Sequence, residues 1–315
     1  METGSTATEI GLLSAIAFIA CVVTVYALAA AAALRLWRRE IHKTVPFADR
    51  IVFALAALGF VCMAYGYFVE PYRLAISHVE IRSSKLAAGQ HPIRIVHFSD
   101  LHSDPKARLE RRLPEAVRRE HPDIIVFTGD SINSPEGLPV LQNCLSALAM
   151  IAPTFVVRGN WDTYDWSHID LFDKTGVREL NGSAVRLEIS GTPVWIAGLA
   201  FNNPLALQKT ARMIPGGEFS VLLYHSPDLM PEVTEQRIDL YCAGHTHGGQ
   251  VALPFYGALI TMSRFGKRYE AGLYHDSNTW LYVNRGIGMV GRLAPRVRFC
   301  SRPELTVIDI RPAAV

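Results

Sequence analysis

Two long apolar segments near the N-terminus constrain the fold of this chain more than any other feature of its sequence. Residues 10–34 and residues 51–69 contain no Asp, Glu, Lys or Arg. A helix needs about 20 such residues to cross the hydrocarbon core of a bilayer. The alternatives are a buried core helix or a signal peptide, but the first segment is too long for a signal peptide and follows the acidic Glu2 and Glu9. We therefore predict a two-helix membrane anchor over residues 1–70.

Charge and cysteine content argue against two other classes of protein. The formal net charge is +2 and no cluster of Lys and Arg stands out, so we expect no nucleic-acid partner. The five cysteines lack the spacing of a structural zinc site or of a disulfide framework. Cys242 lies in an apolar stretch, where we expect a small buried side chain.

After residue 70 the sequence has the pattern of an α/β protein. A first strand is expected over Leu74–Ile81, within a segment of residues 71–92 that links the anchor to a catalytic domain of residues 93–312. Short runs rich in Ile, Val and Phe then alternate with helical patterns, which is typical of strands buried on both faces. The next predicted strands are Arg94–Ser99, Asp123–Thr128 and Thr154–Arg158. The helices between them are Ala107–Glu120, which Pro114 is able to break in two, and Leu138–Met150.

The second half of the domain is richer in strands. Residues 190–193 have the composition of a hairpin turn between the first two of them. The strands predicted in this half are Ala184–Ile189, Val194–Gly198, Phe219–Tyr224, Asp239–Ala243, Thr279–Val283 and Leu305–Ile310. The fold class that this order predicts is α/β, with two packed sheets flanked by helices in one catalytic domain.

Polar residues follow the carboxyl ends of five of these strands, where open α/β sheets place their sites. In chain order they are Asp100 and His102, Asp130, Asn160 and Asp162, His225, and His245 and His247. Each motif alone is a weak signal, since Gly-Asp and Gly-Asn often mark turns and a lone His is often a core residue. Together, Asp, His, Asp, Asn, His, His and His supply the donors for two adjacent divalent cations that share one carboxylate.

The ordered set D-x-H, G-D, G-N-x-D, a lone His and G-H-x-H resembles the calcineurin-like metallophosphoesterase family, over about residues 93–310. The resemblance implies a four-layer sandwich built on two mixed sheets. It implies that Asp100, His102 and His247 hold one metal, that Asn160, His225 and His245 hold the other, and that Asp130 bridges them. Asp130, Asn160 and His225 would also act in catalysis. Manganese is the metal that we expect first, although iron, zinc and cobalt accept the same donors.

Two such cations would lower the pKa of water and bind phosphoryl oxygens, so no protein nucleophile is needed. A Ser-His-Asp hydrolase is disfavoured, because the chain has no G-x-S-x-G motif. A non-catalytic membrane scaffold on the same fold is the alternative from another class. A scaffold is expected to have lost ligands, whereas every implied ligand position is filled here.

The segments Gly248–Val251 and Arg264–Tyr269 resemble the membrane-linked bacterial subgroup of this family, which includes UDP-2,3-diacylglucosamine pyrophosphatases of lipid A synthesis. This resemblance implies a bacterial inner membrane, the lipid bilayer as partner, and a phosphorylated lipid or nucleotide-lipid as substrate. A broad-specificity phosphodiesterase acting on soluble or cell-wall phosphoesters is the alternative that we keep open.

Trp161 departs from the family pattern, in which this position is often a histidine that protonates the leaving oxygen. Tryptophan cannot do so, which favours a pyrophosphate or another substrate with a stable leaving anion. His168 or a water on the metals could replace the missing acid, and Trp161 could instead stack on a base or cover an acyl chain. Other candidate substrate contacts are Asp162, Arg264, Lys267, Arg268 and Arg285.

Charge around the two apolar segments bears on topology. The connecting loop contains Arg35, Arg38, Arg39, Lys43 and Arg50, whereas no Lys or Arg precedes it. Basic loops stay in the cytoplasm, so this bias predicts an extracytoplasmic catalytic domain. The basic residues after the second segment, Arg73, Arg82, Lys85 and Arg94, oppose it. A nucleotide-lipid substrate would also require a cytoplasmic domain, so both orientations stay open.

Overall fold

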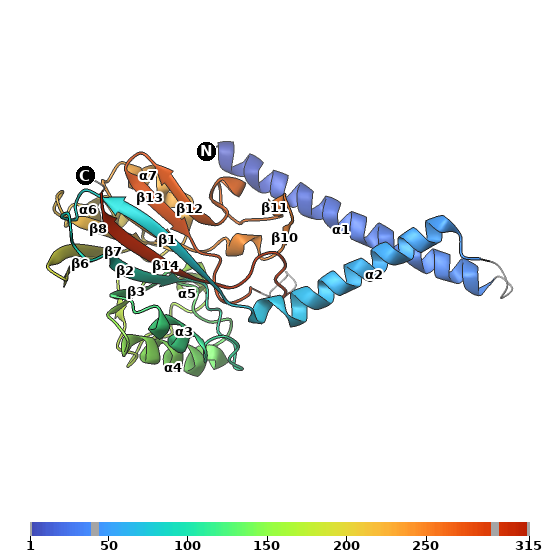
Figure 1. Cartoon of the computed structure of the whole chain (residues 1–315), viewed down its shortest axis with the longest axis horizontal. Coiled ribbons are helices and arrows are strands. Elements are labelled where there is room, and N and C mark those ends of the chain that lie inside the picture. The colour runs from blue at the N-terminus through green and yellow to red at the C-terminus, as the bar shows by residue number, and fades with distance from the viewer. Residues whose placement is uncertain (1, 39–43, 291–295, 314–315) are drawn as a thin grey trace.

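The chain forms a long helical hairpin joined to an α/β domain (Figure 1). The computed structural model describes residues 2–38, 44–290 and 296–313. Helices α1 (Glu2–Trp37) and α2 (Phe47–Phe68) contain spans long and apolar enough to cross a membrane. Their most apolar windows are 0% and 6% buried, so they are not core helices of a soluble domain. The two predicted apolar helices are confirmed, while Arg39 and Lys43 of the connecting loop lie outside the described residues.

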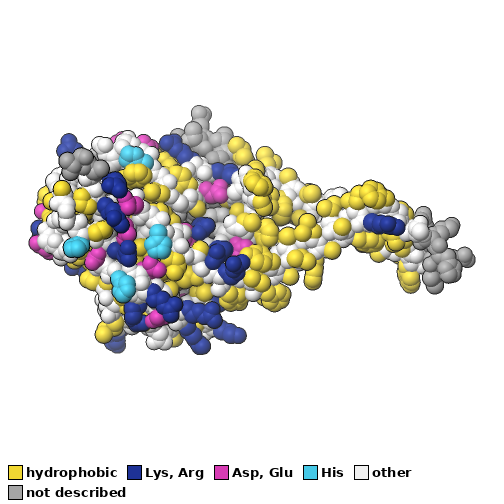
Figure 2. Space-filling model, in the orientation of Figure 1, with side chains coloured by type: hydrophobic (Ala, Val, Ile, Leu, Met, Phe, Trp, Pro, Cys, Tyr) yellow, Lys and Arg dark blue, Asp and Glu magenta, His cyan; other side chains and the backbone are white. Residues whose placement is uncertain are grey.

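Two polar contacts join the helices of the hairpin. Near its turn, Arg35 Nη2 lies 2.7 Å from Asp49 Oδ1. Further along, the hydroxyl of Tyr26 donates to the carbonyl of Ala56 at 3.1 Å, beside Gly59. The outer surface is almost entirely apolar, whereas charges of both signs cover the domain (Figure 2). An apolar outer surface is what a bilayer requires, because lipid tails cannot form hydrogen bonds with polar groups.

The first sheet has the strand order β1-β14-β2-β3-β4-β5. Its strands are β1 (Ala75–Ser83), β14 (Glu304–Pro312), β2 (Ile93–Phe98), β3 (Ile124–Phe127), β4 (Thr154–Val156) and β5 (Arg178–Glu179). All neighbours are parallel except β14 and β2. Because β1 pairs along its whole length with β14, the strand predicted in the linking segment is part of this sheet.

The second sheet has the order β12-β13-β9-β8-β7-β6. Its strands are β12 (Gly272–Asp276), β13 (Thr279–Val283), β9 (Leu240–Ala243), β8 (Phe219–Leu223), β7 (Thr192–Gly198) and β6 (Ser183–Ile189). β6 and β7 form the predicted hairpin, which turns at Ser190 and Gly191 with φ of 49° and 80°. A small antiparallel pair, β10 (Ala252–Leu253) and β11 (Gly257–Ala258), lies outside both sheets.

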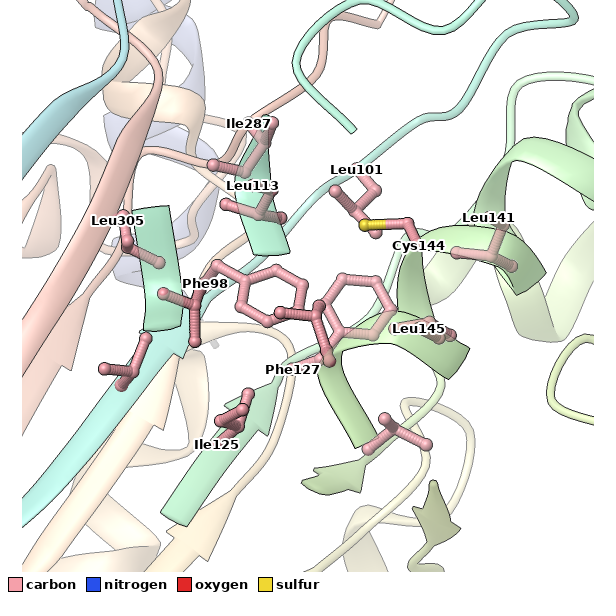
Figure 3. Packing of buried hydrophobic residues seen from close by; sticks show 14 of the residues in the cluster. Phe98, Leu101, Leu113, Ile125, Phe127, Leu141, Cys144, Leu145, Ile287 and Leu305 are labelled. Carbon is pink, nitrogen blue, oxygen red and sulfur yellow. The ribbon is translucent and has the colours of Figure 1, made fainter. Parts of the chain in front are cut away.

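Three apolar clusters hold the layers together. One lies between the two sheets and includes Ile95 of the first and Val221 of the second. Another joins the outer face of the first sheet to α3 (Leu113–Arg119) and α4 (Leu138–Ala149), with the rings of Phe98 and Phe127 stacked at 5.0 Å (Figure 3). The third joins the second sheet to α6 (Leu207–Ala211) and α7 (Met230–Thr234). The predicted α/β fold with two packed, helix-flanked mixed sheets is confirmed, and Cys242 is fully buried.

One predicted helix is too long. The sequence indicated Ala107–Glu120, but α3 begins at Leu113 and residues 107–112 form turns. The cause is Pro114, which lacks the N–H that a helix interior needs and is tolerated only in the first turn.

Candidate active site

The candidate site lies where the carboxyl ends of strands from both sheets meet. β2, β3 and β4 run parallel in the first sheet, and β8 and β9 run parallel in the second. The loops that follow them carry Asp100 and His102, Asp130, Asn160, His225, and His245 and His247. The structure therefore brings the predicted ligands together from five loops.

Two carboxylates stand at the centre of this cluster. Asp100 Oδ1 lies 3.2 Å from His247 Nε2 and 3.8 Å from His225 Nε2. Asp130 Oδ2 lies 3.3 Å from His225 Nε2 and 3.5 Å from His102 Nε2. Two groups of three donors result, Asp100 with His102 and His247, and Asp100 with Asp130 and His225, each with its donor atoms within 4.8 Å of one another. Each carboxylate thus contacts histidines of both predicted metal sites.

Backbone carbonyls orient two of the imidazoles. Nδ1 of His225 lies 2.7 Å from the carbonyl oxygen of Thr128, and Nε2 of His245 lies 3.3 Å from that of Met262. Because a carbonyl only accepts, these nitrogens are the protonated ones. The other nitrogens, His225 Nε2 and His245 Nδ1, face each other across the site at 3.2 Å and offer lone pairs to a cation once they carry no proton. Such fixing of the tautomer is typical of metal-ligating histidines.

The backbone is unusual at five of the predicted ligands. Asp100, His102, Asp130, His245 and His247 have φ of 50°, 40°, 57°, 72° and 52°. Non-glycine residues rarely adopt this left-handed conformation, and where they cluster they commonly mark functional sites. Hydrogen bonds between neighbouring loops hold it, including those from the Asp100 amide to Gly129 O at 2.8 Å and from the His102 amide to Asp130 O at 3.0 Å.

Two glycines allow these loops to approach closely. A Cβ atom on Gly159 would lie 2.2 Å from Asp130 Oδ1, and one on Gly244 would lie 2.4 Å from Asp100 Oδ2. Any larger residue would displace a central carboxylate. The glycine of the G-N-x-D motif and that of the G-H-x-H motif are therefore required sterically, because a side chain at either position would collide with a central carboxylate.

Asp162 lies behind the ligand loops. Its side chain is fully buried and accepts hydrogen bonds from the backbone amides of Asp130, Ser131 and Gly159 at 2.8–2.9 Å. Burial and the nearby Asp130 carboxylate raise the pKa of Asp162 to about 6. Because both of its oxygens accept from protein donors, Asp162 holds two ligand loops together, and its contact with substrate stays a prediction. Trp161 adds to this arrangement, since its amide donates to Asp130 Oδ1 at 2.9 Å.

The cluster favours positive charge. Burial opposes ionisation of His225, yet the carboxylates of Asp130 and Asp100 raise its pKa to about 9. Burial likewise opposes the Asp100 carboxylate, but His247 and His225 hold its pKa below the ordinary value. Burial lowers the pKa of His102 to about 4, so this imidazole is neutral and able to donate a lone pair.

The donor set fits divalent cations. Among the described residues, Asn160 Oδ1 and His102 Nε2 are buried and have no hydrogen-bond partner. Buried polar atoms normally have one, so these two need a partner that the chain itself does not supply. Together with two central carboxylates and the lone pairs of oriented imidazoles, they match the oxygen and nitrogen donors that manganese, iron, zinc and cobalt accept.

Sequence reasoning missed a buried arginine behind the site. Arg298 is fully buried, and its guanidinium donates to the carbonyls of Gly286, Gly288 and Ser301 and lies 3.3 Å from His247 Nδ1. Burial lowers its pKa to about 9. The hydroxyl of Ser301 donates to the carbonyl of His247 at 2.6 Å. No motif marks these residues, because only the fold brings them to the ligand loop.

Aromatic side chains line the site. The ring of Trp161 is half-buried and meets His102 edge to face, with centroids 5.3 Å apart. Phe201, which the sequence did not single out, lies 6.0 Å from the rings of both His225 and His245. His168, the alternative proton donor, is exposed beyond α5 (Asn160–Tyr164).

The four predicted phosphate-binding cations all have partners within the domain. Arg264 pairs with Glu232 at 3.0 Å, Arg268 with Asp276 at 3.5 Å and Arg285 with Glu304 at 3.0 Å, while Lys267 lies 3.5 Å above the ring of Tyr256. The stem of Arg285 lies beside Gly248, the residue after His247. Their role in substrate binding stays a prediction.

Comparison with known proteins identifies the family. The profile of the calcineurin-like phosphoesterases matches residues 93–249. A metallophosphoesterase of Bacillus subtilis, YkuE, is 33% identical over 261 residues, which cover 78% of this chain and 90% of YkuE. The chain belongs to the calcineurin-like phosphoesterase family. As a member it is a metal-dependent phosphoesterase, so the predicted hydrolase class is confirmed and the scaffold alternative is not supported.

Two further relatives of this phosphoesterase carry more specific names. The phosphodiesterase YaeI of Escherichia coli is 28% identical, over 70% of this chain and 82% of YaeI. The UDP-2,3-diacylglucosamine pyrophosphatase LpxG of Chlamydia trachomatis is 26% identical, over 76% of this chain and 90% of LpxG. At these identities the family is shared, and the individual substrates are not established by the similarity.

Proposed function

We propose that this phosphoesterase hydrolyses a phosphoester or pyrophosphate bond of a lipid-linked substrate at the membrane surface. The observation that carries the proposal is the direct link between the metal-ligand loop and the anchor. Ser301 donates its hydroxyl to the carbonyl of His247 at 2.6 Å and its amide to Glu70 Oε1, also at 2.6 Å. Glu70 follows the end of α2 directly. The site therefore lies close to the point where the hairpin leaves the domain.

The ligand assignment is also part of the proposal. Asp100, His102 and His247 would hold one cation, Asn160, His225 and His245 the other, and Asp130 both, with manganese as the first metal to test. When bound, the cations supply Lewis acidity and a water of lowered pKa. The chain itself contributes orientation. Thr128 and Met262 fix two imidazoles, and Asp162 holds the loops of Asp130 and Asn160 in register.

Trp161 favours pyrophosphate bonds within this class. It carries no group able to protonate an alkoxide, so leaving groups that are already stable anions are preferred. UDP-2,3-diacylglucosamine is the specific substrate that we propose first, because its leaving nucleotide meets this condition and chlamydial relatives carry that activity in their name. A broader phosphodiesterase is the second candidate, supported by the relative YaeI.

Hydrolysis assays with the full chain in vesicles and manganese test the proposal. UDP-2,3-diacylglucosamine, a second lipid pyrophosphate and a soluble dialkyl phosphate, whose leaving alkoxide needs a proton, are compared. We expect both lipid pyrophosphates to be cleaved faster than the soluble diester. Equal or faster cleavage of the soluble diester would support the broader phosphodiesterase instead.

The loop charges and the proposed substrate favour opposite topologies. The cluster of Arg35, Arg38 and Arg50 at the turn of the hairpin favours an extracytoplasmic domain, whereas the UDP-linked substrate proposed first requires a cytoplasmic one. One experiment decides between them. Protease is added to intact spheroplasts. Digestion of the domain supports the extracytoplasmic orientation and a lipid pyrophosphate without a nucleotide. A domain that survives until the membrane is broken supports the UDP-linked substrate.

A further inference from the structure

A narrow apolar groove separates α1 from the catalytic domain. Its volume is about 200 Å³. One wall is the start of the first membrane span, Ile10 and Gly11, and the other is the segment 256–267, here called the groove segment. A hydrogen bond of 2.7 Å between Ser14 Oγ and the Tyr256 hydroxyl closes one end. Sites for drug-sized ligands measure roughly 300–1,000 Å³, so this space suits one linear chain.

The groove lies at the level of the bilayer boundary. Tyr26 of α1 is hydrogen-bonded to Ala56 of α2. Counting the same number of residues from this pair, back along α1 and forward along α2, leads to Ser14 on α1 and to Phe68, the last residue of α2. Ser14 and Phe68 therefore lie at a similar height along the hairpin. Phe255, next to the groove segment, and Met262 within it are largely exposed, as expected for side chains that meet lipid.

The lining offers a ligand little but apolar surface. Leu259, Ile260 and Phe265 contribute hydrocarbon and aromatic faces. The three hydroxyls of the lining are already bonded, Thr261 to the carbonyl of Gly266 at 2.9 Å, Ser263 to Asp228 at 2.5 Å and Tyr256 to Ser14 at 2.7 Å. The ammonium of Lys267 donates to the carbonyl of Tyr256. An acyl chain needs apolar contact and no hydrogen bonds, so its chemistry matches this lining.

The groove adjoins the active site at Met262. Met262 lines the groove, and the carbonyl of the same residue accepts from His245 Nε2 at 3.3 Å. A chain lying in the groove would therefore contact a residue that is hydrogen-bonded to a predicted metal ligand. We propose that the groove binds an acyl chain of the lipid-linked substrate and delivers its phosphoryl group to the metal centre. This inference rests on the proposed function and adds the route by which the lipid reaches the site.

The test uses a series of alkyl pyrophosphates, from ethyl to decyl, with the full chain in detergent micelles. In the wild type, kcat/KM is expected to rise with chain length, because each buried methylene adds about 0.8 kcal/mol. Gly11→Leu narrows the groove, since a Cβ there already meets Leu259 O at 3.3 Å. Ile260→Asn makes its wall polar. Both variants should lose about tenfold in kcat/KM for decyl pyrophosphate, equivalent to about 1.4 kcal/mol, and keep wild-type turnover of ethyl pyrophosphate.

Ala17→Leu, which places the same side chain on the exposed face of α1, is the matched control and should leave the whole series unchanged. Retained chain-length dependence in both groove variants overturns the inference but not the proposed function. A wild type without any chain-length dependence overturns the proposed function, and the inference with it.

Cross-linking of the wild type tests the same inference without depending on whether the variants fold. A decyl pyrophosphate with a diazirine at the chain end is cross-linked to the wild type, and the labelled peptides are identified. Labels within residues 10–14 or the groove segment support the inference. Labels confined to other parts of the chain overturn it.

Discussion

The two helices of the hairpin join the catalytic domain in different ways. The end of α2 is built into the core, where Gly66 O accepts from the Arg298 amide at 2.9 Å and the buried Glu70 accepts from Ser301. The start of α1 instead lies across the groove and is held by a side-chain contact between Ser14 and Tyr256. The α2 junction positions the metal-ligand loop, whereas the α1 junction leaves space for a ligand. Substitutions near α2 and in the metal centre should therefore affect all substrates, and only the groove should distinguish chain lengths.

The largest effect is expected at the predicted metal centre, because turnover of every substrate depends on it, whichever junction is considered. Asp130→Asn removes a charge shared between the predicted metal sites and should abolish turnover of ethyl and decyl pyrophosphate alike. The fold should persist, because the hydrogen bonds of the Asp130 backbone remain. Turnover and circular dichroism measure the two effects. Asp173→Asn, at an exposed carboxylate, is the control. Full activity after exhaustive chelation would refute the metal-dependent proposal.

A gain of function is expected at Trp161. Trp161→His restores a proton donor beside His102 and should raise turnover of alkyl phosphodiesters by roughly 10²–10⁴-fold. Pyrophosphates should change little at either chain length, because their leaving groups need no proton. Steady-state kinetics on both substrate classes measure this. If the wild type already cleaves unactivated alkyl diesters as fast as pyrophosphates, the interpretation of Trp161 is wrong.

A smaller loss is expected at the carboxylate that ties the ligand loops. Asp162→Asn keeps the shape but replaces one acceptor oxygen with a donor facing the amides of Asp130 and Gly159. Supporting groups of this kind typically contribute 10–100-fold to metal affinity. The manganese concentration for half-maximal activity should rise accordingly, equally for short and long substrates. An unchanged metal requirement would mean that Asp162 acts only in folding.

The smallest effect is expected at the α2 junction. Glu70→Ala leaves the buried amide of Ser301 without its acceptor, which costs about 1–3 kcal/mol of folding stability. Thermal unfolding in detergent should show a lower Tm, and any loss of activity should be the same for ethyl and decyl pyrophosphate. Glu115→Ala, at an exposed ion pair of α3, is the control. If Glu70→Ala lost activity toward decyl pyrophosphate alone, the α2 junction would also distinguish chain lengths, and the proposed difference between the two junctions would be wrong.

Local sequence pattern predicted much of the fold. An uncharged run long enough to cross a bilayer as a helix can adopt few structures other than that helix, so both long helices were predicted. Strands buried on both faces, such as β2 and β3, were found because continuous apolar runs mark them. The pattern failed where that signal was weak. β12 is only half-buried, and β5, β10 and β11 have two residues each, so none was predicted.

The sequence by itself also predicted which residues gather in the candidate metal cluster, because parallel strands place their carboxyl ends, and the polar residues after them, at one edge. Only the tertiary structure decided what supports and surrounds that cluster. Glu70 and Ser301 are 231 positions apart, and Ser14 and Tyr256 are 242 apart. No local periodicity encodes such pairs. The role of Asp162, the buried Arg298 and the groove beside α1 exist only once the two sheets and the hairpin have packed together.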